Sequence, residues 1–391
     1  MMVHIAAMTE RLYYRDSYLK SFHARVLDSS PDARRLYLDR TAFYPTSGGQ
    51  PFDLGSLSGI AVEEVVDEGD RIAHTLAAPV NAAVVEGAID WVRRFDHMQQ
   101  HTGQHLLSAV FVDLLNANTV SFHLGAEYCT IDLAIGSLQP AQVIAVEKKA
   151  NQIVSENRPV RIEFQDASLA TDLRKASERE GELRIVSIDG LDRSACGGTH
   201  VRATGEIGPI LIRKLDKIRN NVRVEFLCGG RAISRARADF DALSQIAKVL
   251  SAPIDDTPAL VTAQIEKALQ ADKARRRLST ELATARGRQL YNETQPDANG
   301  LRKATRRVPA ITEELRAEAQ SFTAQSKAVL LVLAEDPPSA LLAASKDSGL
   351  NAGRWLQEAL TSAGGRGGGS PIMAQGSLPT QEALDGIVAR F

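Results

Sequence analysis

Two pairs of residues in this chain have the spacing of metal ligands. His101 and His105 are four residues apart in a stretch with helical periodicity, so both imidazoles should project from one helix face, one turn apart. Cys196 and His200 have the same separation, and the two glycines between them allow a tight wrap of the backbone. Together the pairs offer two or three imidazoles and one thiolate. This borderline-soft donor set suits Zn²⁺ better than Mg²⁺ or Ca²⁺.

Neither pair by itself is specific evidence for a metal site. Two histidines at this spacing more often mark a polar helix face, and a single Cys-x-x-x-His motif is weaker still. The chain has only eight histidines and three cysteines, so the co-occurrence of both pairs favours a metal site. A metalloprotease is disfavoured, because that chemistry places a glutamate directly after the first histidine as general base, and Thr102 stands there.

Further motifs accompany the two pairs in order along the chain. They are Met98–Ser108, Ser121–Gly125, Thr130–Leu133, Cys196–Val201 and Thr204–Pro209. This ordered set resembles the editing domain of alanyl-tRNA synthetase, and still more its free-standing relatives, the AlaX proteins. The loop Phe43–Pro51 is similar to the glycine motif in the N-terminal β-domain of longer AlaX proteins. The stretch Gly364–Gly376 is similar to the DHHA1 domain of the longest type.

The resemblance implies an editor that acts in trans, since the aminoacylating domain of the synthetase has no counterpart before the first motifs. Its expected reaction is deacylation of mischarged tRNA(Ala), chiefly Ser-tRNA(Ala) and also Gly-tRNA(Ala). On this resemblance His101, His105, Cys196 and His200 correspond to the zinc ligands of the family. Three protein ligands and a water would form an open, catalytic site, whereas four would form a closed, structural one.

No side chain is assigned as catalytic at this stage. A hydrolytic zinc would lower the pKa of a bound water to ~7 and polarise the ester carbonyl. Alternatively, the zinc positions the amino group of the substrate while a water that is not bound to the metal attacks. The sequence leaves both mechanisms open.

Editing must distinguish serine from alanine, which lacks the hydroxyl. A site that hydrogen-bonds this hydroxyl rejects alanine strongly, because its own polar group would then stay unpaired. Thr119 and Ser121 follow the predicted helix and are candidates for this contact; alternatively, both are ordinary strand hydroxyls. Gly48 and Gly49 are predicted to let the backbone approach the aminoacyl end, or only to shape a turn.

The remaining pattern predicts an α+β multidomain protein that positions these residues. Residues 1–90 are β-rich and predict a small barrel-like domain, and residues 91–240 predict an α+β editing domain that contains the zinc. Residues 241–325 predict a long helical linker. Residues 326–391 predict a small α/β domain similar to DHHA1.

Local signals add predictions about single elements. Asp96 is the predicted N-cap of the helix that carries His101, and Thr380 that of the last helix. The stretch Gly364–Gly369 is predicted to be a loop, with backbone amides that could cradle a phosphate. Cys129 and Cys228 lie in strand-like segments and are expected to be small buried hydrophobes.

The overall charge of the chain is nearly balanced. Its 46 basic and 48 acidic residues give a net charge of -2, which excludes a uniformly basic coat for nucleic acid. Two segments are nevertheless basic: residues 202–223 hold six basic and two acidic side chains, and residues 273–307 hold ten and three. They are predicted to contact tRNA phosphates, although a solvated helix face is the commoner origin of such runs.

Partners and location follow from weaker signals. No apolar run reaches the ~18 residues that span a bilayer, and no secretory signal is visible, so a cytoplasmic protein without membrane contact is expected. The long helix and the DHHA1-like region predict a homodimer.

Two other functions stay open from the sequence. The same scaffold could act on another charged tRNA, as in the editing domain of threonyl-tRNA synthetase, but the glycine motif and the DHHA1-like tail argue against this. The second alternative is a non-catalytic module for tRNA binding or dimerisation, in which a closed set of three His and one Cys only stabilises the middle domain.

Overall fold

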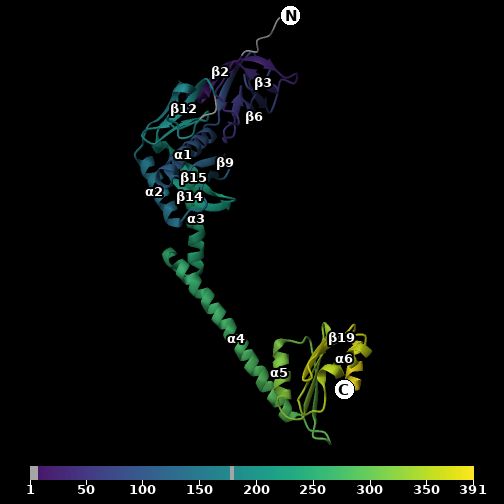
Figure 1. Ribbon diagram of the computed structural model, residues 1–391. Helices are drawn as coiled ribbons and strands as arrows, with labels where there is room; N and C mark the ends of the chain where they lie inside the picture. Colours follow the sequence, from purple (N-terminus) through teal and green to yellow (C-terminus); the bar gives the residue numbers. More distant parts are fainter. Residues whose placement is uncertain (1–7, 177–179) are drawn as a thin grey trace. The chain divides into compact units, whose positions relative to one another are not determined.

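The computed structural model describes residues 8–176 and 180–391 (Figure 1). The chain divides into two compact units, one up to Gln245 and one from Ile246 onward. The predicted α+β class with an N-terminal barrel, a central α+β region, a long helix and a C-terminal α/β region is confirmed. The boundaries between the four predicted domains remain predictions.

The N-terminal region is a closed six-stranded barrel in the order β2-β3-β7-β6-β5-β8. Its strands are β2 (Ser21–Ser29), β3 (Arg35–Leu38), β5 (Gly55–Leu57), β6 (Ile60–Asp67), β7 (Ile72–Leu76) and β8 (Val84–Ile89); a short pair, β1 (Glu10–Arg11) and β4 (Arg40–Thr41), flanks them. Buried and exposed residues alternate along β8, as expected for a strand with one face in the core. The loop between β4 and β5 carries Gly48 and Gly49.

Helix α1 (Trp91–Leu115) follows the barrel directly and is buried along most of its length. Its N-cap is Asp90, whose side chain accepts a hydrogen bond from the backbone nitrogen of Arg93. The predicted N-cap Asp96 is therefore wrong. The N-cap lies six residues earlier, and the Asp96 carboxylate instead pairs with Arg231 at 2.6 Å.

Two sheets and a second helix surround α1 in the central region. One sheet has the order β14-β15-β10-β9 and the other β11-β12-β13. The elements are β9 (Thr119–Leu124), β10 (Cys129–Leu133), α2 (Pro140–Ser155), β11 (Val160–Asp166), β12 (Glu182–Ile188), β13 (Asp192–Ala195), β14 (Ile210–Ile218) and β15 (Asn221–Cys228). The apolar side of α1 packs with α2 and the first sheet in one core.

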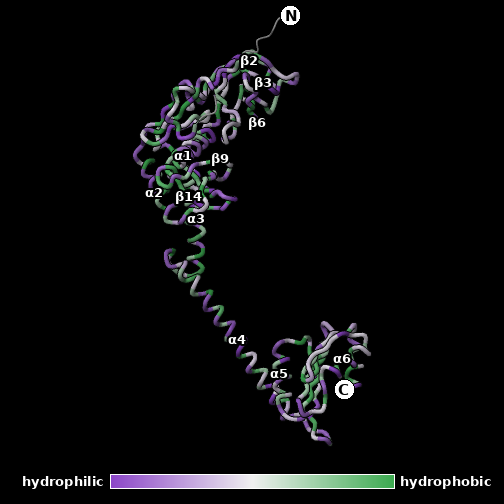
Figure 2. Tube along the Cα trace, viewed as in Figure 1, coloured by the Kyte–Doolittle hydropathy of each residue, from purple (hydrophilic) through white to green (hydrophobic). Residues whose placement is uncertain are grey.

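The second unit contains a long helix and a five-stranded sheet in the order β16-β17-β18-β20-β19. Helix α3 (Gly229–Val249) leads from the first unit to α4 (Thr257–Glu293). The other elements are β16 (Arg302–Val308), α5 (Glu313–Thr323), β17 (Ala328–Glu335), β18 (Pro338–Ala344), α6 (Ala352–Ser362), β19 (Arg366–Gly369), β20 (Met373–Ser377) and α7 (Glu382–Arg390). Helix α5 covers one face of the sheet and α6 and α7 cover the other, so β17 is apolar and buried up to Ala334; Figure 2 shows the hydrophobic residues gathered between α5 and α6.

Two local predictions in this unit are wrong. Most of the expected glycine loop, Arg366–Gly369, is the edge strand β19, because its small residues pack closely on α6 and β20. The last helix has Gln381 rather than Thr380 as N-cap, although the Thr380 hydroxyl still accepts a hydrogen bond from Ala383. In the described part of the chain, no helix is long and apolar enough to cross a membrane.

Candidate metal centre

The four residues predicted as metal ligands lie together in the structure. His101 and His105 project from α1, and Cys196 and His200 come from the loop that follows β13. Their potential ligand atoms all lie within 4.8 Å of one another, and the three histidines are almost completely buried. The helix fixes the first pair by its period, but only the tertiary fold brings the second pair to it.

The thiol and the imidazoles face a common point. The Cys196 Sγ lies 3.5 Å from Nε2 of His101 and 3.3 Å from Nε2 of His200. In a tetrahedral zinc site with Zn–N of about 2.0 Å and Zn–S of about 2.3 Å, nitrogen and sulfur ligands are about 3.5 Å apart. The donor types and these spacings therefore fit a zinc-sized ion.

Each histidine is held by a hydrogen bond on its outer nitrogen. Nδ1 of His101 lies 2.9 Å from Oε1 of Gln50, that of His105 3.0 Å from Oδ2 of Asp192, and that of His200 3.1 Å from Oγ1 of Thr102. An oxygen that can only accept, such as those of Gln50 and Asp192, keeps the proton on Nδ1 and leaves the lone pair on Nε2, which is the tautomer that binds a metal. Sequence reasoning did not assign Gln50, Asp192 or Thr102 to the site.

Gln50 connects the barrel to this centre. It is fully buried, and its Oε1 accepts hydrogen bonds from His101 and from the backbone nitrogen of Thr199, while its Nε2 donates to the Thr199 hydroxyl. The glycine motif contains Gln50 and was the only sequence signal that pointed to it.

Gly198 shows how closely the Cys196–His200 loop approaches α1. A Cβ at this position would lie 2.2 Å from Cε1 of His101 and 3.1 Å from Oε1 of Gln50. A side chain here would therefore displace the imidazole or its partner. This contact gives a specific reason for a glycine, and the predicted tight wrap of the loop is confirmed.

Charges around the centre set the protonation of the ligands before a metal enters. Burial disfavours the His105 imidazolium, but the hydrogen bond to Asp192 outweighs this and raises the pKa of His105 to about 9. Burial lowers the pKa of His200 to about 3. Burial opposes the Cys196 thiolate, yet the neighbouring His101 and His200 hold its pKa well below the usual value. Near neutral pH the His105 imidazole of the free site is therefore protonated.

We expect metal uptake to release a proton from His105. Because its pKa is about 9 in the free site, metal and proton compete below that pH, and metal affinity should fall by about tenfold per pH unit between pH 9 and 7. Proton release on zinc addition can be followed with an indicator in weakly buffered solution. Asp192→Asn should reduce the release and weaken zinc binding by about 10- to 100-fold. A flat affinity over this pH range would contradict the prediction.

The centre opens into a cavity of about 610 Å³, hereafter the metal cavity. Its lining includes His101, His105, Cys196 and Gly48, together with the nearly buried Arg184, which donates to the carbonyl of Cys196 at 2.6 Å. Gly49 is not part of this lining. It has φ +84° and packs against Phe122, and a Cβ there would lie 3.0 Å from the Phe122 carbonyl oxygen.

Thr119 and Ser121 line a second, smaller cavity of about 300 Å³, hereafter the hydroxyl cavity, which also includes His105. Both are strand residues whose hydroxyls have partners: Thr119 donates to the Ser108 hydroxyl at 2.7 Å, and Ser121 donates to Asp132 at 2.8 Å. The structure therefore places both residues beside the candidate metal ligand His105.

Comparisons with known proteins agree with this architecture. The model described as Threonyl and Alanyl tRNA synthetase second additional domain matches residues 183–225, and the DHHA1 domain model matches residues 310–391. The alanyl-tRNA editing protein AlaX-L of Pyrococcus horikoshii is 31% identical over 394 residues, which cover 95% of each chain. The chain belongs to the AlaX-L family of alanyl-tRNA editing proteins.

The family also shares sequence with much longer enzymes. Alanine–tRNA ligases of Pyrococcus abyssi and Methanoregula boonei are 31% and 32% identical to this AlaX-L family member over 401 and 394 residues. These matches cover 97% and 96% of the chain, which spans only 43% and 42% of the two ligases.

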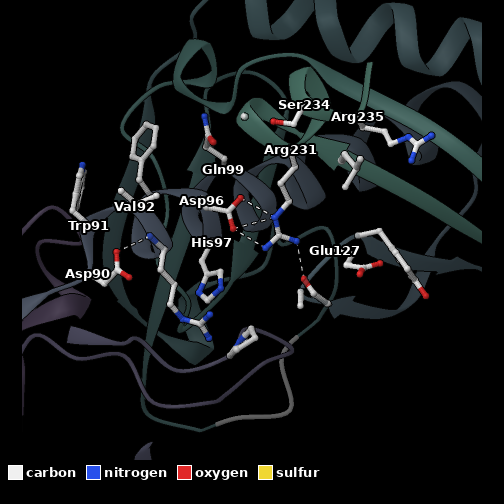
Figure 3. Close-up of a pocket in the computed structure, with 18 of the residues that line it drawn as sticks. Asp90, Trp91, Val92, Asp96, His97, Gln99, Glu127, Arg231, Ser234 and Arg235 are labelled. Carbon is white, nitrogen blue, oxygen red and sulfur yellow. Dashed lines mark hydrogen bonds and ion pairs between the residues drawn. The ribbon is translucent and has the colours of Figure 1, made fainter. Parts of the chain in front are cut away.

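A further cavity of this AlaX-L family member, about 1060 Å³, contains none of the four candidate ligands (Figure 3). It lies where the start of α1 meets α3. Figure 3 shows Asp96 and Arg231 pointing toward each other across it. The buried His97 also lines it, and burial lowers the pKa of this imidazole to about 3. His97 is therefore neutral near neutral pH.

The remaining cysteines and His123 have no place in the centre. Cys129 and Cys228 are completely buried, as predicted, and burial raises the pKa of the Cys129 thiol to about 12. His123 is exposed on β9 and is outside the cluster of potential ligands.

Proposed function

We propose that this chain is a trans-editing hydrolase that deacylates mischarged tRNA(Ala), chiefly Ser-tRNA(Ala) and also Gly-tRNA(Ala). The observation that carries the proposal is the buried cluster of three imidazoles and one thiolate, each imidazole oriented by its own partner, at the base of an open cavity. Similarity to the AlaX-L editing protein of Pyrococcus horikoshii supplies the class of substrate.

Zinc is the proposed metal, held by His101, His105, Cys196 and His200. When bound, it would supply Lewis acidity for ester hydrolysis or a fixed point for the substrate amino group. The protein supplies orientation: Gln50 and Asp192 hold two imidazoles in the metal-binding tautomer, and Thr102 orients that of His200.

The proposed substrate contacts surround the metal cavity. Gly48 lines it and would let the ester end of the tRNA pass close to the backbone, while Gly49 would shape this loop by its packing on Phe122. Thr119 and Ser121 are proposed to line the pocket for the serine side chain in the adjoining hydroxyl cavity.

A deacylation assay tests the proposal. Purified protein is given Ser-, Gly- and Ala-tRNA(Ala), with and without a zinc chelator. We expect rapid loss of serine, slower loss of glycine, retention of alanine, and inhibition by the chelator that added zinc reverses. Binding of tRNA without turnover of any ester would instead support the non-catalytic module.

The second unit is proposed to bind tRNA and to pair with a second copy. Exposed arginines of the basic segment 273–307, such as Arg275 and Arg276, are the candidates for phosphate contact. The C-terminal sequence match to the DHHA1 domain covers the end of this unit.

Removal of the second unit should weaken tRNA binding but leave the zinc content unchanged. A chain that ends after Ser251 keeps α3 and all four candidate ligands, so zinc content should stay at the level of the full chain. Affinity for tRNA(Ala) should fall at least about tenfold, because one of two linked binding regions is lost. Equilibrium binding and metal analysis check this. Metal loss in the shortened chain would contradict the proposed division.

A further inference from the structure

Gln104 occupies a special position between the two cavities. It lies on α1 between His101 and His105, and it lines both the metal cavity and the hydroxyl cavity. Its side chain is only 7% exposed. A polar group so close to the candidate metal ligands and so little solvated needs a hydrogen-bond partner, either in the protein or in a ligand.

One end of the Gln104 amide is fixed. Its Nε2 donates to the Ser108 hydroxyl at 2.9 Å, and that oxygen also accepts the hydroxyl of Thr119 at 2.7 Å. Ser108 is completely buried one turn further along α1, so the amide is anchored to a rigid element. The other end, Oε1, has no hydrogen-bond partner among the residues that the structure describes.

The neighbouring hydroxyls already donate their protons elsewhere. The proton of Thr119 goes to Ser108, and that of Ser121 goes to Asp132, whose carboxylate is also bound by Arg223 at 2.7 Å. The amide oxygen of Gln104 is an acceptor only. Because Gln104 lines both cavities, this oxygen offers an open acceptor beside them.

We propose that Oε1 of Gln104 accepts the side-chain hydroxyl of a seryl ester and thereby sets the preference for serine over alanine. Thr119 acts through Ser108, by holding the amide in place. With alanine the oxygen would face a methyl group and lose its hydrogen bond without replacement. This inference rests on the proposed function and names the residue that reads the substrate side chain.

The test measures deacylation of Ser-tRNA(Ala) and Gly-tRNA(Ala) by the full-length zinc-loaded protein. Glycine has no hydroxyl and is the internal reference. Gln104→Leu keeps the approximate volume and should lower kcat/KM for the seryl ester by about 10- to 100-fold, with less than about threefold change for the glycyl ester. Zinc content should stay unchanged. Gln104→Met serves as a second apolar variant if the leucine variant folds poorly.

Two control variants separate Gln104 from its neighbours. Thr119→Val removes the anchor of Ser108 and should lower the serine-to-glycine ratio less than Gln104→Leu does. Ser121→Ala tests the other hydroxyl in the same cavity: a larger fall in the serine-to-glycine ratio than Gln104→Leu causes would overturn the proposal. If Thr119→Val abolishes the serine preference while Gln104→Leu preserves it, the proposal is overturned.

A binding measurement keeps this inference distinct from the proposed function. Unreactive 3′-amide analogues of seryl- and glycyl-adenosine are titrated into wild-type and Gln104→Leu protein. A serine preference in the wild type that the variant loses supports the role of Gln104, even if no ester is hydrolysed. An equal preference in both proteins refutes it, whether or not the wild type is an active deacylase.

Discussion

Cys196→Ala is expected to remove both bound zinc and deacylase activity. The thiolate is the only anionic donor among the four candidate ligands, and two imidazole nitrogens lie within 3.5 Å of it. Loss of a partner to a ligand typically weakens metal binding 10- to 100-fold, so loss of the thiolate itself should exceed about 100-fold in affinity and in kcat/KM. Metal analysis after dialysis and the Ser-tRNA(Ala) assay measure the two effects.

A second cysteine provides the matched control for this result. Cys129 is completely buried but lies outside the cluster, so Cys129→Ala should keep the zinc and the activity per folded molecule. Retention of zinc together with full activity in Cys196→Ala would refute the proposed ligand set. Retention of zinc with loss of activity would move Cys196 from metal binding to substrate contact.

Asp53→Asn is expected to produce the largest loss of stability. Asp53 and Arg94 form an ion pair in which both side chains are completely inaccessible to solvent. Arg94 also donates to the carbonyl oxygen of Ser17 at 2.8 Å, and Asp53 accepts from the backbone nitrogen of Tyr44 at 2.6 Å. Breaking a buried pair leaves a charge without compensation and typically costs about 3–5 kcal/mol in the free energy of unfolding.

Denaturant unfolding of the first unit measures this loss. The exposed pair Arg34–Glu63 of the same unit offers the contrast, since Glu63→Gln should change stability by less than about 1 kcal/mol. Asp53 is three residues after Gln50, so the variant should also weaken zinc binding by loosening the loop that orients His101. Unfolding curves of Asp53→Asn that match the wild type would show that the pair does not hold the barrel to α1.

Most of the fold class followed from local patterns. Alternation of apolar residues predicts the barrel strands, and helical spacing predicts α1, because burial on one face imposes these periods. Errors occurred where tertiary contacts override local signals. Asp96 resembles an N-cap in the sequence, but its carboxylate binds Arg231, which is 135 residues away along the chain. The glycines of β19 look like a loop, yet close packing on α6 selects a strand.

The sequence by itself determined the types of the metal ligands and their two local spacings. A separation of four residues on a helix is fixed by the helical period, and glycines in a short loop permit a tight wrap. Nothing local specifies which partners orient them. Gln50 reaches His101 across 51 residues and Thr199 across 149, and Asp192 reaches His105 across 87. Only the tertiary structure decided these contacts and the open acceptor of Gln104, because each depends on how the barrel, α1 and the two sheets pack together.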